Sequence, residues 1–177
     1  MPAIDELPRE ELLALLKNFA KNWLAHDGLW FQAVERAHGM EEAIELDAQA
    51  YERFSAIEAK RIKDFLGLPE RGGLEALKTA LEYRLYAVLN KQHSELEHGY
   101  LRFYMDDCRV QSARKRRGLS DFPCKRVGFV EYSSFAAEID PRIKTSCIAC
   151  PPDEHPDEYY CGWKFWIEEE GDGRSGR

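Results

Sequence analysis

The first half of the chain has apolar residues at helical spacing. In four segments they recur every three or four residues with polar residues between them, which predicts amphipathic helices. A His26-Asp27-Gly28 sequence separates the first two segments, and Gly39 follows the second. We therefore expect a layer or bundle of four helices with short connections. The predicted helices cover residues 8–25, 29–38, 40–66 and 74–92.

The second half of the chain has a different pattern. Residues 100–105 are rich in aromatics and residues 159–167 alternate between two faces, so both segments predict strands, and residues 143–149 are expected to be extended. Residues 109–117 and 124–139 predict two helices. The predicted fold class is α+β, with an N-terminal helical layer followed by a small cysteine-bearing antiparallel sheet with two helices. We expect a single domain over residues 1–177, with a helical subregion (8–93), a cysteine-rich subregion (98–168) and a flexible tail (169–177).

Composition narrows the class of protein. The 177 residues are 44% hydrophobic and 32% charged, which is typical of a globular protein with a core of its own. The net charge of −7 argues against general binding to nucleic acid or anionic membranes. The N-terminus lacks the basic and apolar regions of a signal peptide, and no apolar run is long enough to span a membrane. We therefore expect a cytoplasmic protein, in a reducing compartment where structural disulfides are rare.

All five cysteines follow residue 107, and two of them form a C-x-x-C motif. Two thiolates at this spacing can both face one soft metal ion from a tight turn. A returning strand would bring a third cysteine to the pair, and a predicted helix start supplies a fourth. This pattern predicts zinc, or alternatively an iron–sulfur cluster. Reactive thiols and simple burial are the other two interpretations. The predicted ligands are Cys124, Cys147, Cys150 and Cys161.

Cys108 stands apart from this set. It follows a predicted strand and opens a basic helix, and both a helix N-terminus and nearby cations lower the pKa of a thiol. The preceding Asp106 and Asp107 act against that shift. Cys108 is therefore the candidate catalytic nucleophile, for which the sequence alone places no general base.

A second candidate site involves acidic residues on apolar stripes. Asp47 and Glu58 share the apolar stripe of the predicted helix 40–66, but eleven residues separate them by roughly 16 Å, so they cannot share one ion or proton. Each could instead meet His26 or Asp27, or bind an arginine or a backbone amide. The aromatic-rich segment around Asp27 can line a ligand pocket, although Asp27 could equally cap the next helix. His26, Asp27, Asp47 and Glu58 are the predicted ligand-binding residues.

The segment 109–126 has seven basic residues and one acidic residue. Such a segment can hold a phosphate, a carboxylate or RNA. We favour the alternative that it is a solvated surface that pairs with the acidic helices of the first half.

Several long motifs resemble those of known families. NWLAHDGLWFQAVE, DDCRVQSARKRRGL and the segment from FPCKRVGFVEYSS to DEYYC resemble an uncharacterised family of cytosolic bacterial and archaeal proteins, over roughly residues 8–168. That family is distantly similar to the aminothiazoline carboxylate hydrolase-like proteins, whose namesake opens a thiazoline ring. The closing C-x-x-C…C-x-W-x-F is similar to the small-molecule-binding domain of vinyl reductase type. These resemblances imply an α+β fold with a cysteine site and leave the reaction open.

Three functional hypotheses follow. The first is a hydrolase-like enzyme whose thiolate-bound metal is structural or acts as a Lewis acid on a small-molecule substrate. The second is a non-enzymatic redox or ligand sensor, or a binding module, with a closed four-thiolate site. The third is a structural protein with an unmetallated thiol cluster. In each case the expected partner is a small molecule rather than nucleic acid or membrane, and a homo-oligomer is left open.

Overall fold

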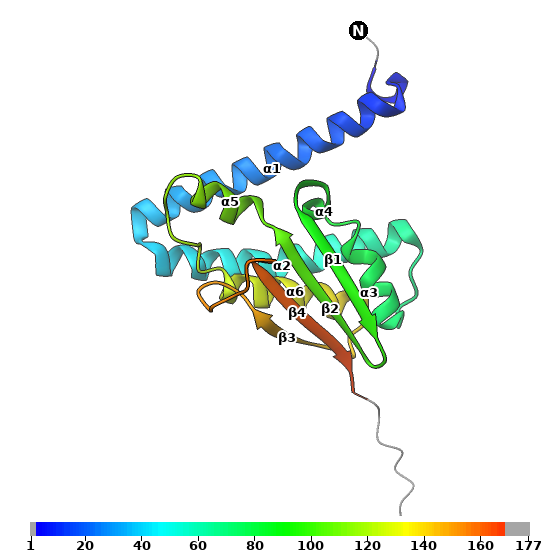
Figure 1. Cartoon of the computed structure of the whole chain (residues 1–177). Coiled ribbons are helices and arrows are strands. Elements are labelled where there is room, and N and C mark those ends of the chain that lie inside the picture. Colours follow the sequence, from blue (N-terminus) through cyan, green and yellow to red (C-terminus); the bar gives the residue numbers. More distant parts are fainter. Residues whose placement is uncertain (1–2, 169–177) are drawn as a thin grey trace, which may run out of the picture.

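The computed structural model describes residues 3–168, so the predicted tail 169–177 lies outside the described residues. The helical elements lie mostly in the first half and the strands in the second (Figure 1). In chain order the elements are η1 (Ile4–Glu6), α1 (Arg9–His38), α2 (Met40–Leu66), α3 (Gly73–Leu81), α4 (Leu85–Leu89), β1 (Lys91–Glu97), β2 (Tyr100–Asp107), α5 (Arg109–Lys115), α6 (Lys125–Ile139), β3 (Ile143–Ala149) and β4 (Cys161–Ile167).

The predicted α+β class is confirmed. The four strands form one antiparallel sheet with the order β1-β2-β4-β3. α6 lies against the sheet, α2 packs on α6, and α1 crosses α2 as the outermost layer (Figure 1). α3 fills the remaining corner between α6 and the strands. The main core therefore lies between the sheet and α6, and a second, smaller core lies between α1, α2 and α6.

Large side chains fill the main core. Trp163 and Phe165 of β4, which alternate on one face as the sequence pattern predicts, are fully buried against Phe135 of α6. Gly128 lets α6 approach this face, because a Cβ there would lie only 2.8 Å from Cζ2 of Trp163. The contact between Gly128 and the Trp163 ring thus sets how closely α6 packs on the sheet.

The predicted break at His26-Asp27-Gly28 is wrong, because α1 is continuous from Arg9 to His38. Two aromatic residues on either side of this segment, Trp23 and Phe31, lie eight residues apart and therefore face the same side of a helix. They pack on Phe54 and Phe122, respectively. This packing offsets the cost of about 1 kcal/mol for a glycine inside a helix. The chain turns instead at Gly39, whose φ of +90° suits glycine.

The predicted helix 74–92 is also corrected. The structure has two helices and the start of a strand there, because Arg84 is extended (φ −67°, ψ 153°) and β1 begins at Lys91. The helical part of the chain therefore ends before residue 93, and the sheet begins earlier than the predicted boundary at residue 98. β1 was missed because its side chains are mostly polar and its pairing with β2 is a tertiary interaction.

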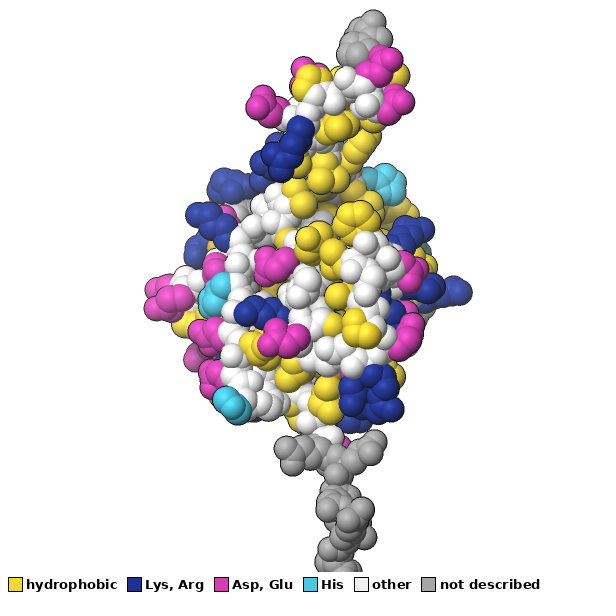
Figure 2. All heavy atoms as spheres, turned by 90° about the vertical axis from the view of Figure 1, so that its right-hand side faces the viewer, with side chains coloured by type: hydrophobic (Ala, Val, Ile, Leu, Met, Phe, Trp, Pro, Cys, Tyr) yellow, Lys and Arg dark blue, Asp and Glu magenta, His cyan; other side chains and the backbone are white. Residues whose placement is uncertain are grey.

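The N-terminal half of α1 extends beyond the other elements (Figure 1), and hydrophobic side chains run along it (Figure 2). Ala20 is the one buried residue of this 30-residue helix. Among the described residues, no helix is long and apolar enough to cross a membrane.

Candidate functional site

Acidic and aromatic side chains from four helical elements meet in the smaller core. At the centre is Arg84, the residue just before α4, whose side chain is almost completely buried. Its Nε donates a hydrogen bond of 2.9 Å to Glu58 of α2, and a terminal nitrogen lies 2.6 Å from Oε1 of Glu131 of α6. The guanidinium also stacks on the rings of Tyr132 and Phe135. Arg84 therefore joins α2, α4 and α6 from the inside.

Glu58 binds an arginine and a backbone amide, the two kinds of partner that were one of the alternatives predicted for it. Besides Arg84, its other carboxyl oxygen accepts a 3.2 Å hydrogen bond from the backbone amide of Leu85. Glu131 is less well compensated. Burial raises its carboxyl pKa, the charges of Glu58 and Asp27 raise it further, and the opposing effect of Arg84 does not cancel them. The partners of Glu58 thus give it a structural role. The charge of Glu131, by contrast, acts on the acidic residues that lie nearer to α1.

Asp27 and Asp47 lie on that α1 side of the cluster. Burial raises the pKa of Asp47 to about 7, and the carboxylates of Asp27 and Glu131 add to the effect. The pKa of Asp27 is also raised by burial, although His26 and a hydrogen bond with Tyr51 act in the opposite direction. Both predicted acids therefore belong to one cluster, in which the charge of Asp27 raises the pKa of Asp47.

Aromatic side chains pack in the same small core, and one of them, Tyr51, forms a hydrogen bond with Asp27. Trp23 stacks on Phe54 with ring centroids 5.2 Å apart, and the edge of Tyr86 meets Trp23 at 6.3 Å. The hydroxyl groups of Tyr51 and Tyr86 form a 2.5 Å hydrogen bond. The arrangement combines π faces, hydroxyl groups and carboxyl groups, which suits a small ligand that carries a positive charge or a hydrogen-bond donor.

His26 is exposed, and it acts on the cluster through its electrostatic effect on Asp27. Of the four predicted ligand-binding residues, Asp27 and Asp47 therefore lie together, Glu58 lies at the arginine end, and His26 lies at the outer edge. We call the group formed by Trp23, Asp27, Asp47, Tyr51, Tyr86 and Glu131 the carboxyl cluster.

The cysteines lie around the N-terminus of α6. Cys124 is the N-cap residue of α6, and its sulfur lies 3.6 Å from that of Cys150, which follows β3. Cys150 also forms a hydrogen bond with Cys161, the first residue of β4. The bond from Cys150 and one from Gln111 lower the pKa of Cys124, whereas burial raises the pKa of Cys147 to about 11. Cys124 is therefore the thiol best placed to ionise.

The structure does not show the predicted metal site. Within residues 3–168, no group of three or more His, Cys, Asp or Glu side chains is arranged to hold a metal ion as it stands. Cys124, Cys150 and Cys161 come together from three separate segments, whereas Cys147, which the C-x-x-C spacing was expected to bring to the same site, lies on β3. The assignment of these four thiols to a metal stays a prediction.

Cys108 is the N-cap residue of α5, where the sequence placed it. Burial is the main cause that raises the pKa of its thiol to about 12, and neighbouring thiols contribute. The side chain is therefore a neutral thiol near pH 7. A nucleophilic role for Cys108 stays a prediction that would require a base to remove this proton.

Sequence reasoning missed several members of these sites. Arg84 and Tyr86 fall where a regular helix was expected, and Glu131 lies on a helix analysed only for its boundaries. Gln111, which lies beside Cys124, was also missed. Its side-chain nitrogen donates to the carbonyl of Phe122 and lies 3.4 Å from the sulfur of Cys124, and its oxygen accepts from the Phe122 amide. A buried amide held in this way orients the thiol.

The basic segment has one partner on an acidic helix of the first half, as the favoured alternative requires, and another in the second half. Arg126 forms an ion pair with Glu45 of the acidic helix α2, and Lys125 lies 2.6 Å from Asp153. Both basic side chains are exposed or half-buried on the surface. These contacts favour a solvated surface over a nucleic-acid site.

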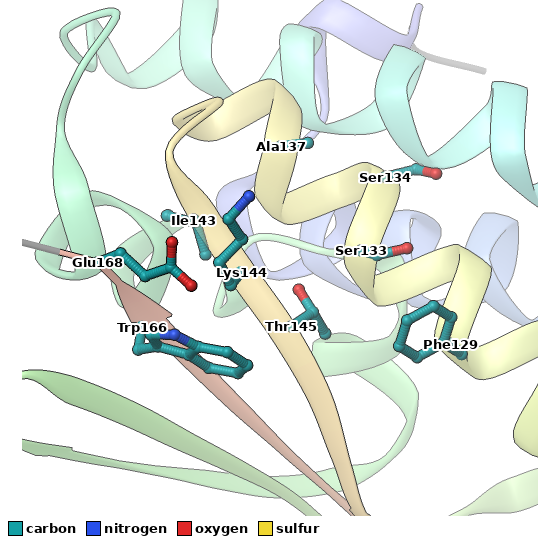
Figure 3. A pocket seen from close by; sticks show the side chains of 9 residues that line it. All are labelled: Phe129, Ser133, Ser134, Ala137, Ile143, Lys144, Thr145, Trp166 and Glu168. Atoms are coloured by element: carbon teal, nitrogen blue, oxygen red, sulfur yellow. The ribbon is translucent and has the colours of Figure 1, made fainter. Parts of the chain in front are cut away.

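Two shallow surface grooves flank α6. One, with a volume of about 620 Å³, lies between α6 and the edge strand β3 and is lined by Ser133, Thr145 and Trp166, among others (Figure 3). The other, of about 580 Å³, lies between α2 and the start of α6. Neither groove is lined by a residue of the carboxyl cluster or by a cysteine. We therefore base the functional argument on the chemistry of the cluster rather than on these grooves.

The fold and the site define an α+β protein with a helical layer and a buried acidic and aromatic cluster. Residues 5–167 match the model of a family of unknown function (DUF6125), and the chain belongs to this family. No curated protein matches the sequence. The phenol-responsive sensory domain of the transcription activator PoxR, in its structure with phenol, is similar in fold, with a TM-score of 0.53 and 15% sequence identity over 81% of this chain and 73% of that domain.

Proposed function

We propose that this protein is a small-molecule-binding module, of sensory rather than enzymatic type, and that its ligand binds at the carboxyl cluster. The observation that carries the proposal is the accumulation of Asp27, Asp47 and Glu131 in a largely buried aromatic setting, with a raised pKa for all three. Such an arrangement is costly for the free protein and becomes favourable when a ligand supplies a donor or a positive charge.

The comparison of folds supports a binding role. The structure of the similar sensory domain contains phenol, a small aromatic molecule with one hydrogen-bond donor. In this chain, Trp23 and Tyr86 supply aromatic faces for such a ring, and the carboxyl groups supply acceptors for its polar substituent. Because the acceptors are acidic, we infer that a small aromatic amine binds more tightly than the corresponding alcohol.

The test compares benzylamine with benzyl alcohol and phenol by isothermal titration calorimetry. We expect benzylamine to bind most tightly, with an affinity that rises as the pH increases through 7 because Asp47 ionises there. Asp47→Asn should abolish both the preference and the pH dependence. Asp64→Asn, on an exposed part of the same helix, is the matched control and should change neither. The proposal fails if none of the three probes binds, or if Asp47→Asn binds benzylamine as the wild type does.

We also propose that Cys124, Cys147, Cys150 and Cys161 hold zinc, with an iron–sulfur cluster as the alternative. The 3.6 Å separation of the Cys124 and Cys150 sulfurs is close to the edge of a tetrahedral zinc–thiolate site, about 3.8 Å for Zn–S bonds of about 2.3 Å. The position of Cys124 at the N-terminus of α6 and its bond from Gln111 favour a thiolate there. Binding would require the Cys147 and Cys161 side chains to turn toward this pair.

Elemental analysis of protein purified anaerobically without chelator tests this second proposal. We expect one zinc per chain, which Cys150→Ser should remove and the control Cys108→Ser should retain. A brown protein with visible absorption would indicate iron and sulfur instead. Metal-free protein that takes up no added zinc would overturn the proposal. The hydrolase-like activity stays a prediction that would require a base beside the neutral thiol of Cys108.

A further inference from the structure

Two thiols at the start of α6 lie almost within bonding distance of each other. The sulfurs of Cys124 and Cys150 are 3.6 Å apart, although 26 residues separate them in the chain. A disulfide bond joins two sulfurs at about 2.0 Å, so this pair has to close by only about 1.6 Å. Both side chains are free thiols in the structure. The packing of α6 against β3 therefore places these two thiols where a small shift can join them.

The two thiols differ in their access to solvent. Cys124 is half-buried, whereas Cys150 is 1% exposed. Pro123 and Lys125, on either side of Cys124, line the surface groove between α2 and the start of α6. The side-chain amide of Gln111, which two further hydrogen bonds hold in place, donates to the Cys124 sulfur at 3.4 Å. An oxidant in solution therefore meets Cys124 before Cys150, and finds its sulfur held in a fixed position.

We propose that Cys124 and Cys150 form a reversible oxidation site, which a hydroperoxide converts into a disulfide. The Cys124 thiolate attacks the terminal oxygen of the peroxide, the O–O bond breaks, and the leaving alkoxide takes up the thiol proton, so that a sulfenic acid remains on Cys124. The sulfur of Cys150 then attacks the Cys124 sulfur, the S–O bond breaks, and water leaves with the Cys150 proton. Two thiols lose two electrons and two protons in total, and one hydroperoxide is reduced to an alcohol and water.

This oxidation gives the proposed zinc site a second state. The disulfide uses two of the four proposed zinc ligands, so bound zinc is expected to leave as the disulfide forms. That consequence rests on the zinc proposal. The disulfide itself depends only on the position of the two sulfurs. The site would thus convert exposure to peroxide into the loss of a metal ion from the start of α6.

Peroxide treatment of the full chain as purified, followed by a count of free thiols, tests the oxidation. We expect the free thiols to fall from five to three, because one disulfide uses two of them, and dithiothreitol to restore all five. Trypsin with a glutamate-specific protease separates Cys124, in residues 118–125, from Cys161, in residues 159–164, and leaves the C-x-x-C motif in residues 145–154. A disulfide between the peptides 118–125 and 145–154 supports the proposal.

Three variants identify the partner of Cys124. Cys150→Ser should abolish the disulfide, and Cys147→Ser should retain it. Cys108→Ser, which removes a thiol outside the pair, is the matched control and should also retain it. A disulfide between the peptides 118–125 and 159–164, a disulfide that Cys150→Ser retains, or five thiols that stay free after treatment would each overturn the proposal.

The zinc content before and after treatment separates this proposal from the proposal of a zinc site. We expect zinc to be released in step with the disulfide. A zinc-free protein that forms the disulfide would overturn the zinc site and support the oxidation site. A zinc-loaded protein that forms no disulfide would overturn the oxidation site alone.

Discussion

Buried charges occur in two regions of this protein, and the two regions treat them in opposite ways. At the junction of α3, α6 and β3, Asp140 accepts hydrogen bonds from the Gly73 amide and from the backbone and side chain of Arg142, and its pKa falls to about 2. In the carboxyl cluster, Asp47 lies among other carboxylates and its pKa rises to about 7. The first carboxylate stabilises the native fold, and the second opposes it.

The difference separates a region whose charges are paired from a region with an excess of acidic groups. Lys63 near the first region is also fully paired, with Glu70 at 2.9 Å and the carbonyl of Glu138 at 3.0 Å. A region in which every charge has its partner has little to gain from a ligand. The carboxyl cluster, by contrast, has acidic groups in excess of the charge that Arg84 supplies to Glu58 and Glu131, which is the excess that the proposed ligand would relieve.

The largest change in stability is expected at Arg84, the buried cation that pairs with both Glu58 and Glu131. Arg84→Met should lower the free energy of unfolding by about 3–5 kcal/mol, because it leaves Glu58 and Glu131 buried without their cation. Urea unfolding followed by circular dichroism measures the change. Arg102→Met, which removes an arginine paired with Glu97 on the sheet surface, should have no detectable effect. Adding Glu58→Gln and Glu131→Gln to the Arg84 variant should recover part of the loss; no recovery would contradict this explanation.

Asp140→Ala should lower the free energy of unfolding by about 2–3 kcal/mol near pH 7, since it removes a fully buried carboxylate that accepts hydrogen bonds from the half-buried amides of Gly73 and Arg142. The pKa of Asp140 is depressed from 3.8 to about 2. Its contribution is therefore complete above about pH 4 and is lost as the pH falls toward 2. Unfolding curves at pH 7 and pH 2.5 should converge for wild type and variant, and a difference that persists at low pH would point to packing instead.

The smallest effect has the opposite sign. Asp47→Asn should raise the free energy of unfolding by about 1–2 kcal/mol at pH 8, because the wild type has to ionise a carboxyl group whose folded pKa is about 7 rather than 3.8. Between pH 4 and 7 the folded carboxyl keeps its proton while the unfolded one loses it, so wild-type stability falls as the pH rises and levels off above 7. The advantage of the variant should vanish near pH 4. A destabilised variant at pH 8 would show that Asp47 has an unrecognised structural partner.

Parts of the fold and of both sites could be predicted from sequence because they depend on local patterns. The amphipathic spacing of α2 and the alternation in β4 were sufficient for those elements. Asp47 and Glu58 stood out because acids interrupt an apolar stripe, and their separation on one helix already excluded a shared proton. The break predicted at Asp27-Gly28 failed because local propensity there is weaker than the packing of Trp23 and Phe31 on other elements.

The sequence by itself determined the α+β class, most of the helices and strands, and the residue types that carry chemistry, since these follow from side-chain periodicity and composition. Only the tertiary structure decided which of these residues meet. Asp27, Asp47 and Glu131 come from three helices. Burial raises the pKa of each, and the charge of Asp27 raises the pKa values of Asp47 and Glu131 further. The same holds for the meeting of the thiols of Cys124, Cys150 and Cys161. Distances between segments remote in sequence set these properties, and no local pattern encodes them.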